Sequence, residues 1–307
     1  MVNIYKSNKT HLIKINKFEE GCWINVIKPT DEEIKNLSQM CNIEEPALIL
    51  ALDEEEKAHI EVEDKHTVIV VDVAVKDSEG VHEFVTIPLG IILSEHFIIT
   101  VCLREVDLLK DFLTNQVKTF FTYKKTRFIL QLLYKNASYY LHYLRYIDRV
   151  SNKVEQQLRE NMNNKDLLYL LELEKSLVYF TTALRANEIV LEKMMRMEKI
   201  KQYKEDRELL EDVIIENKQA MEMASVYSNI LSETRDAFSS VISNNLNTVM
   251  QTLTSITIIL ALPTMIFSFF GMNVPLPWEQ NPLGYIYITF SSVICIFIGS
   301  YFIFKNF

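Results

Sequence analysis

A series of small and polar residues recurs at helical spacing inside an apolar segment near the C-terminus. Its members are three or four positions apart, so they would share one face of a helix. The series is Asn247, Met250, Thr254, Thr257, Ala261, Thr264 and Ser268. Such side chains either let neighbouring helices pack closely or line a water-filled path in which neutral oxygens face a hydrated ion. The second interpretation requires a homo-oligomer, because one helix cannot enclose a pore.

The chemistry of this series is that of neutral oxygen atoms. It contains no carboxylate, which argues against a proton relay within the membrane. Neutral oxygens suit an ion that keeps most of its water, and Mg²⁺ behaves in this way because it dehydrates reluctantly.

Two apolar segments must position this series. Val249–Phe270 would be about 33 Å long as a helix, enough to cross a hydrocarbon core. Tyr285–Phe304 is a second apolar run, and the short connection between them carries one charge, Glu279. So short a connection makes the two spans antiparallel neighbours. The Lys and Arg residues of the flanks predict that the N- and C-termini are both cytoplasmic.

The rest of the chain divides into a mixed region and a helical region. The segment between Gly90 and Pro263 lacks both glycine and proline, which predicts long helices with turns near Asn161–Asn164 and Lys201–Asp206. The last helix should begin near Arg207 and continue into the first span. Its seam of small and polar residues suggests a loose, multi-stranded or water-lined bundle. The seam includes Leu210, Val213, Asn217, Ala220, Ala224, Tyr227 and Leu231.

The first ~120 residues contain short runs rich in β-branched residues, which are typical of strands. Thr30 with Glu33 predicts a capped helix start, and Pro46–Leu52 predicts a short helix. The expected strands are Trp23–Ile27, His59–Val62, Thr67–Val75, Val81–Pro88 and His96–Val101.

Composition excludes several classes of protein. The 307 residues include 32 basic and 41 acidic ones, for a net charge of −9. This charge disfavours nucleic-acid binding, and the last 71 residues contain only two of the charges, Glu279 and Lys305, which disfavours a soluble monomer. The N-terminus is too polar for the apolar region of a signal peptide, so we expect the charged body to stay in the cytosol. The four cysteines form no CxxC pair. No P-loop, GxSxG or HExxH motif is present, so we expect no enzyme.

The first span ends in Gly271-Met272-Asn273, and at this point the chain resembles the CorA family of divalent-cation transport proteins, the two-transmembrane GxN group. Asn247–Thr254 is similar to the family's Asn-x-Val-Met-x-x-Leu-Thr segment. Trp23–Asn25 resembles its N-terminal Trp-Ile-Asn strand, and Ala51–Glu56 resembles its Ala-Leu-Asp-Glu-Glu-Glu stretch. The resemblance runs in order through nearly the whole chain.

The resemblance implies an α+β cytosolic domain, a long helical stalk and two C-terminal transmembrane helices, assembled as a homopentameric funnel in the cell membrane. It implies a transporter or channel for Mg²⁺, with Co²⁺ and Ni²⁺ as further cargo, gated by cytosolic metal. We expect divalent cations, the lipid bilayer and further copies of the chain as partners, and no organic cofactor. The expected parts are 1–122 (α/β domain), 123–205 (helical hairpin), 206–270 (stalk and first span), 271–284 (external loop) and 285–305 (second span).

The resemblance also assigns roles to single residues. Gly271, Met272 and Asn273 would form the outer selectivity filter, with Asn273 binding the hydrated cation. Leu253 joins Asn247, Met250 and Thr264 at the pore or its hydrophobic gate. Asp212 matches a position that binds regulatory cytosolic Mg²⁺. The other half of that acidic pair falls on or near Ala51, with Asp53 as a substitute, and Glu279 would concentrate cations at the outer mouth.

One residue departs from the family pattern: Phe270 replaces the tyrosine that usually precedes the Gly-Met-Asn triplet.

Two alternative functions stay open. A proton-coupled Zn²⁺ transporter of the same family would carry the same motif, and a non-transporting membrane-anchored scaffold or sensor would share the hairpin. The sequence does not separate these from a Mg²⁺ channel.

Overall fold

The computed structural model describes residues 1–8, 11–77, 83–114, 116–117, 119–161, 163–198, 203–273 and 282–305. The chain divides into two compact units, which we call the α/β unit (Met1–Arg235) and the hairpin unit (Asp236–Phe307). In chain order the elements are β1 (Val2–Ser7), β2 (Leu12–Ile15), β3 (Cys22–Ile27), α1 (Asp31–Cys41), α2 (Glu45–Ile49), η1 (Leu50–Leu52), β4 (His59–Val62), β5 (His66–Lys76), β6 (Phe84–Ser94), β7 (Phe97–Cys102), α3 (Asp107–Leu113), α4 (Lys125–Glu160), α5 (Asn164–Met195), α6 (Lys204–Phe270) and α7 (Gly284–Lys305).

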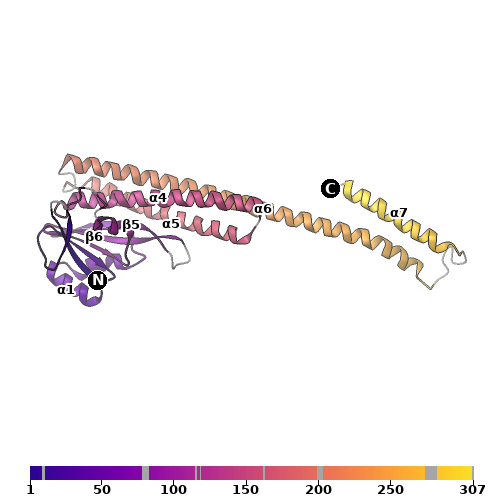
Figure 1. Ribbon diagram of the computed structural model, residues 1–307, viewed down its shortest axis with the longest axis horizontal. Coiled ribbons are helices and arrows are strands. Elements are labelled where there is room, and N and C mark those ends of the chain that lie inside the picture. The colour runs from indigo at the N-terminus through magenta and orange to yellow at the C-terminus, as the bar shows by residue number, and fades with distance from the viewer. Residues whose placement is uncertain are drawn as a thin grey trace. The chain divides into compact units, whose positions relative to one another are not determined.

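A seven-stranded sheet forms the centre of the α/β unit, in the order β2-β1-β3-β7-β6-β5-β4. Its strand pairs are antiparallel except for β3 with β7. Side chains alternate between the two faces. On β5, Ile69 and Val71 join a core with α3, α4 and α5, whereas Val68 and Val70 join a second core with α1 and α2. The sheet is therefore a layer between long helices on one face and short helices on the other (Figure 1).

The structure confirms four of the five expected strands and extends the other. The expected strand at Val81–Pro88 is β6, which continues to Ser94, while Val81 and His82 lie outside the described residues. Pro88 lies just beyond the part of β6 that pairs with β7, where a proline is tolerated. The strands β1 and β2 were not predicted, although Val2 and Ile4 alternate with polar residues.

Pro88 also explains how the sheet is attached to the helices. It lies opposite Asp72 of β5 and has no N–H to donate across the ladder. The Asp72 carbonyl accepts instead from Asn136 Nδ2 (2.9 Å) and Tyr140 Oη (3.2 Å) of α4 and from Asn187 Nδ2 (2.8 Å) of α5. The Asp72 amide donates to Asn187 Oδ1 at 2.9 Å. Helix side chains thus satisfy main-chain groups that the strands leave unpaired.

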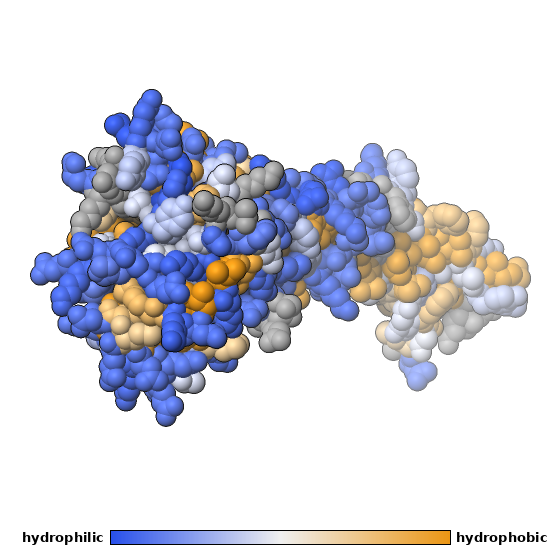
Figure 2. All heavy atoms as spheres, turned by 60° about the vertical axis from the view of Figure 1, so that its left-hand side comes forward, coloured by the Kyte–Doolittle hydropathy of each residue, from blue (hydrophilic) through white to orange (hydrophobic). Residues whose placement is uncertain are grey.

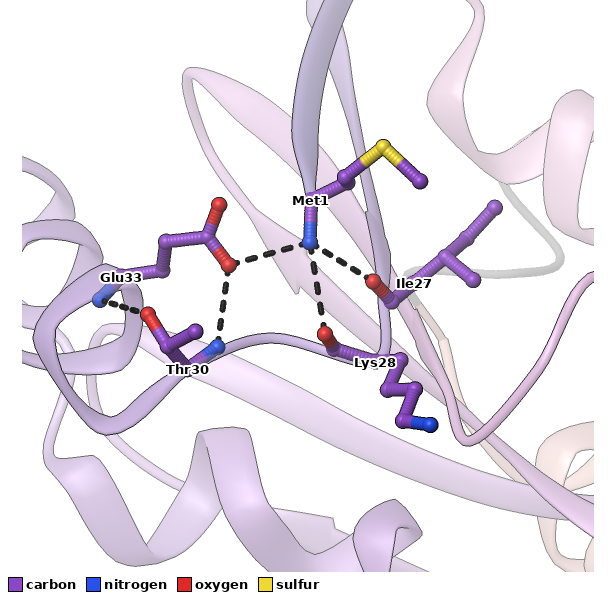
Figure 3. A network of polar contacts seen from close by, with 5 residues as sticks. All are labelled: Met1, Ile27, Lys28, Thr30 and Glu33. Atoms are coloured by element: carbon purple, nitrogen blue, oxygen red, sulfur yellow. Dashed lines mark hydrogen bonds and ion pairs between the residues drawn. The ribbon is translucent and has the colours of Figure 1, made fainter.

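The predicted capping box at the start of α1 is confirmed. The Glu33 amide donates to the Thr30 hydroxyl at 3.3 Å, and Glu33 Oε2 accepts from the Thr30 amide at 2.9 Å. The Met1 amino group lies 3.0 Å from the same carboxylate oxygen (Figure 3). These contacts lower the pKa of Glu33, first through the hydrogen bond from the Thr30 backbone.

The helical region follows the expected pattern, with one helix end in a different place. The turn at Asn161–Asn164 is confirmed, with the Asn163 side chain accepting from the Lys165 amide. The helix α5 ends at Met195, earlier than the expected end near Ile200, and residues 199–202 of the second turn lie outside the described residues.

The seam of α6 was predicted to suit a loose, multi-stranded or water-lined bundle. In the α/β unit it lies in a multi-stranded bundle with α4 and α5, but it is closely packed rather than loose or water-lined. The buried seam residues are Leu210, Val213, Asn217, Ala220, Ala224 and Leu231. Ala220 and Ala224 pack in one core with Tyr140 of α4 and Phe180 of α5. The small alanine side chains make room for these large rings, so α4 and α5 of the same chain cover the seam of α6.

Candidate functional site

The hairpin unit contains the C-terminal part of α6 and α7. Between Gln251 and Phe270, the half-buried residues of α6 follow one face of the helix: Ser255, Ile259, Leu262, Pro263, Ile266 and Phe270. This face contacts α7, because a Cβ at Gly299 would lie 2.8 Å from Leu262 Cδ1. At ~100° per residue, the series from Asn247 to Ser268 lies on nearly the opposite face. We call that series the polar stripe; it points away from α7.

All seven residues of the polar stripe are exposed in the single chain, as is Leu253 beside it. Three of its hydroxyl groups are already committed as donors. Thr254, Thr257 and Thr264 each donate to the carbonyl four residues earlier, at 2.8, 2.8 and 3.0 Å. Such back-bonding uses the hydroxyl hydrogen and leaves an oxygen lone pair facing outward. The stripe can therefore accept hydrogen bonds from the water ligands of a hydrated cation.

The Gly-Met-Asn triplet directly follows the last residue of α6, Phe270. The Gly271 amide donates to the Phe267 carbonyl at 2.9 Å, so the chain keeps a helical turn as it leaves the helix. A Cβ at Gly271 would lie 3.2 Å from that same carbonyl oxygen, a tight contact. Met272 and Asn273 are exposed, and Glu279 lies outside the described residues.

Asp212 is an exposed residue on the part of α6 in the α/β unit. It lines a 640 Å³ cavity with Glu205 and Glu208 of α6 and with Arg127 and Lys135 of α4. Both basic groups already have acidic partners. The Arg127 guanidinium lies 3.1 Å from Glu205 and from Asp206, and the Lys135 ammonium lies 3.0 Å from Asp111.

The second proposed regulatory position has a different environment. Ala51 is buried, and a Cβ at Gly90 of β6 would lie 2.8 Å from the Ala51 Cβ. Ala51 therefore fills the space that Gly90 leaves. Asp53 is exposed at the end of η1, where its carboxylate accepts from the Glu55 amide at 3.0 Å. In the described part of the chain, no three His, Cys, Asp or Glu side chains gather closely enough to hold a metal ion.

The cysteines are free, and three of them are buried. Burial raises the pKa of Cys41 to about 12 and that of Cys102 to about 11. Because a thiolate is the form that binds metal, these thiols are poor ligands.

Comparison with known proteins decides the family. The model of the family described as CorA-like Mg²⁺ transporter protein matches residues 18–306. The chain belongs to this family. A curated relative, the cobalt/magnesium transport protein CorA of Methanocaldococcus jannaschii, is 27% identical over 289 residues, covering 91% of this chain and 88% of the relative.

The fold agrees with CorA structures along the whole chain. The complete structure of the CorA magnesium transporter from M. jannaschii has a TM-score of 0.84 and 25% identity, and the match covers 98% of this chain and 96% of that one. The full-length CmaX protein has a TM-score of 0.71 at 14% identity over 97% of each chain, which shows a shared fold alone. The CorA-like chain thus has the expected α/β domain, long helix and C-terminal helix.

The CorA family is one of divalent-cation transporters, and α6 and α7 are each long and apolar enough to cross a membrane. In Figure 2 hydrophobic side chains gather on the hairpin unit, whereas hydrophilic ones cover most of the visible face of the α/β unit. Gly299 was missed by sequence reasoning, although a glycine in an apolar helix is a known signal of close helix packing.

Proposed function

We propose that this protein conducts hydrated divalent cations, Mg²⁺ before Co²⁺ and Ni²⁺, through a homopentameric pore in the cell membrane. The polar stripe and Leu253 line the pore, and Gly271, Met272 and Asn273 form its outer filter. Its activity is transport, without an enzymatic step or an organic cofactor. Both termini lie in the cytoplasm.

One observation carries the proposal: the polar stripe is exposed and faces away from α7. Five of its seven side chains are polar, and a row of polar side chains is unfavourable against lipid tails. In a homo-oligomer the polar stripes of several subunits would face one another across a central, water-filled path, and their side-chain oxygen atoms would form rings around it. Because the hydroxyls of Thr254, Thr257 and Thr264 already donate to the helix, the rings at these three positions present acceptors to the hydrogens of a hydrated cation and disfavour an anion.

Cytosolic metal closes this pore in the same proposal. Carboxylates that meet between subunits repel one another without a cation and are bridged by one, so metal favours a closed state. Asp212 contributes to such a site, and Asp53 is its candidate partner. The chain then divides by role into 1–122, 123–205, 206–270, 271–284 with Glu279 near the mouth, and 285–305.

Uptake by liposomes containing the purified protein tests the proposal. Mg²⁺, Co²⁺, Ni²⁺ and Zn²⁺ are compared for the wild type and for Asn273→Ala. We expect Mg²⁺ uptake that the substitution lowers about tenfold or more, because each subunit loses its filter amide. Thr252→Ala, on α6 but on the face opposite the stripe, is the matched control and should transport normally.

The other outcomes are equally informative. Zn²⁺ uptake that depends on a pH gradient would replace the proposal with a proton-coupled Zn²⁺ transporter. No uptake of any divalent cation by folded, oligomeric protein would leave a membrane-anchored scaffold or sensor.

A further inference from the structure

A cavity of 740 Å³ lies in the α/β unit where the end of α1 meets the hairpin between β4 and β5. None of its lining residues belongs to the polar stripe or to the proposed regulatory positions. Its lining carries three carboxylates and one ammonium group, so it favours cations. The lining residues are Ser38, Gln39, Asn42, Ile43, Glu44, Glu63, Asp64, Lys65 and His66.

His66 is the unusual member of this lining. The Glu63 amide donates to the His66 carbonyl at 2.9 Å, which closes the hairpin and makes the two side chains cross-strand neighbours. The His66 side chain is only 5% exposed. Its Nε2 has no hydrogen-bond partner among the described residues, although Glu63 Oε2 lies 3.2 Å away in poor hydrogen-bond alignment. A buried polar atom without a partner is unfavourable in the folded state.

The distance between these two atoms suits a shared metal ion. Bonds of ~2.0–2.1 Å to imidazole nitrogen and carboxylate oxygen place neighbouring ligand atoms about 3.0–3.4 Å apart. Glu44 and Asp64 add negative charge around the cavity. The C-terminal end of α1 adds the negative end of a helix dipole, with no basic residue in its last turn.

We propose that His66 Nε2 and Glu63 Oε2 bind a transition-metal ion of the Co²⁺, Ni²⁺ or Zn²⁺ class. Water molecules complete the coordination, since the described chain gathers no third His, Cys, Asp or Glu ligand. Imidazole favours these ions, whereas Mg²⁺ prefers a shell of oxygen atoms. The α/β unit would therefore distinguish a transition metal from Mg²⁺.

Cobalt titration of the metal-free, full-length protein in detergent tests this site, with visible absorption reporting Co²⁺ bound to nitrogen. His66→Gln and Glu63→Gln should each weaken this binding about tenfold or more, because one of two protein ligands is lost. Excess Mg²⁺ should not displace the bound Co²⁺.

His59→Gln is the matched control, because it also removes a histidine beside carboxylates. Its Nδ1 is engaged with the Lys57 carbonyl at 2.7 Å, and Glu56 and Glu61 approach different ring nitrogens, so one ion cannot be shared in the same way. This variant should bind Co²⁺ like the wild type.

Circular dichroism verifies that each variant is folded, and Glu63→Gln removes a ligand while leaving the buried histidine in place. Superimposable titrations for the wild type and both site variants would overturn the proposal, as would equal displacement of Co²⁺ by Mg²⁺. The titration measures binding alone, so its result is independent of whether the protein transports ions.

Discussion

Between Lys204 and Arg235, α6 buries a seam that includes the small residues Ala220 and Ala224 and the polar Asn217, whose Nδ2 donates to the Leu184 carbonyl of α5 at 3.0 Å. Between Asn247 and Ser268 the same helix carries a similar stripe that remains exposed. In the first region α4 and α5 supply large apolar rings that cover the small residues. In the second, α7 covers the opposite face. Residues at similar spacing in one helix are thus buried in the first region and exposed in the second. The difference is whether other segments of the same chain provide side chains that cover them.

Ala261→Leu should break the second region with the largest effect. Ala261 is an exposed member of the polar stripe, so a larger side chain costs little stability in the single chain. In a pore lined by the stripe, each subunit would add three carbon atoms to the path. We expect Mg²⁺ uptake by liposomes to fall about tenfold or more. Unchanged uptake would contradict a pore at this face.

Ala220→Leu is the same substitution in the first region. Ala220 is 0% exposed and packs in the core that contains Tyr140 and Phe180. Overpacking should lower the free energy of unfolding by about 3 kcal/mol, the upper end for an inserted side chain. Denaturant unfolding followed by circular dichroism measures this effect. A variant as stable as the wild type would contradict the close packing around Ala220.

Asp72→Asn tests whether burial in the α/β unit raises the pKa of the Asp72 carboxyl group. Burial raises the pKa of Asp72 from 3.8 to about 6. The folded state then binds this proton more tightly than the unfolded state does, so stability is present below about pH 4 and lost as pH rises through 6. The variant should be more stable than the wild type by about 3 kcal/mol at pH 8, at about 1.4 kcal/mol for each unit of pKa change. The two proteins should differ little at pH 4.

The measurement for Asp72 is the thermal midpoint of both proteins across this pH range. Glu33→Gln is a useful control, because contacts at the helix start lower the pKa of Glu33 and its pH dependence has the opposite sign. A difference between Asp72→Asn and the wild type that does not change with pH would contradict the raised pKa.

Thr30→Ala gives the smallest expected effect. It removes the hydroxyl that accepts from the Glu33 amide and should cost about 1 kcal/mol of stability, measured by denaturant unfolding. Thr30→Ser keeps the hydroxyl and should recover most of the loss. If both variants lose the same stability, the cap is not the cause.

Several elements could be predicted because their signals are local. Thr30 with Glu33 marked the start of α1, and Asn161–Asn164 marked the turn between α4 and α5. The alternation of β-branched residues identified the central strands. The strand was expected to end at Pro88, but β6 continues to Ser94. A proline fits within this strand because β7 does not pair with it at that position, and the sequence alone does not show where the pairing with β7 begins.

The candidate site shows the same division. The spacing of the polar stripe and its position before Gly271 could be read directly, but whether the stripe was covered could not. Ala51 could not be assigned, because its burial against Gly90 depends on η1 meeting a strand about forty residues away in sequence. His66 had no local signal, since it lines a cavity whose other wall comes from the end of α1, more than twenty residues earlier in the sequence.

The sequence by itself determined the periodic features of this CorA-like protein: two apolar helices, a polar stripe with the Gly-Met-Asn triplet at its end, and a charged α/β region. Helical and strand periods depend on neighbouring residues, so one chain segment is enough to define them. Only the tertiary structure decided which faces of these elements are covered. Burial depends on side chains that come from distant segments, and for α6 it separates a seam filled by its own chain from a stripe left exposed.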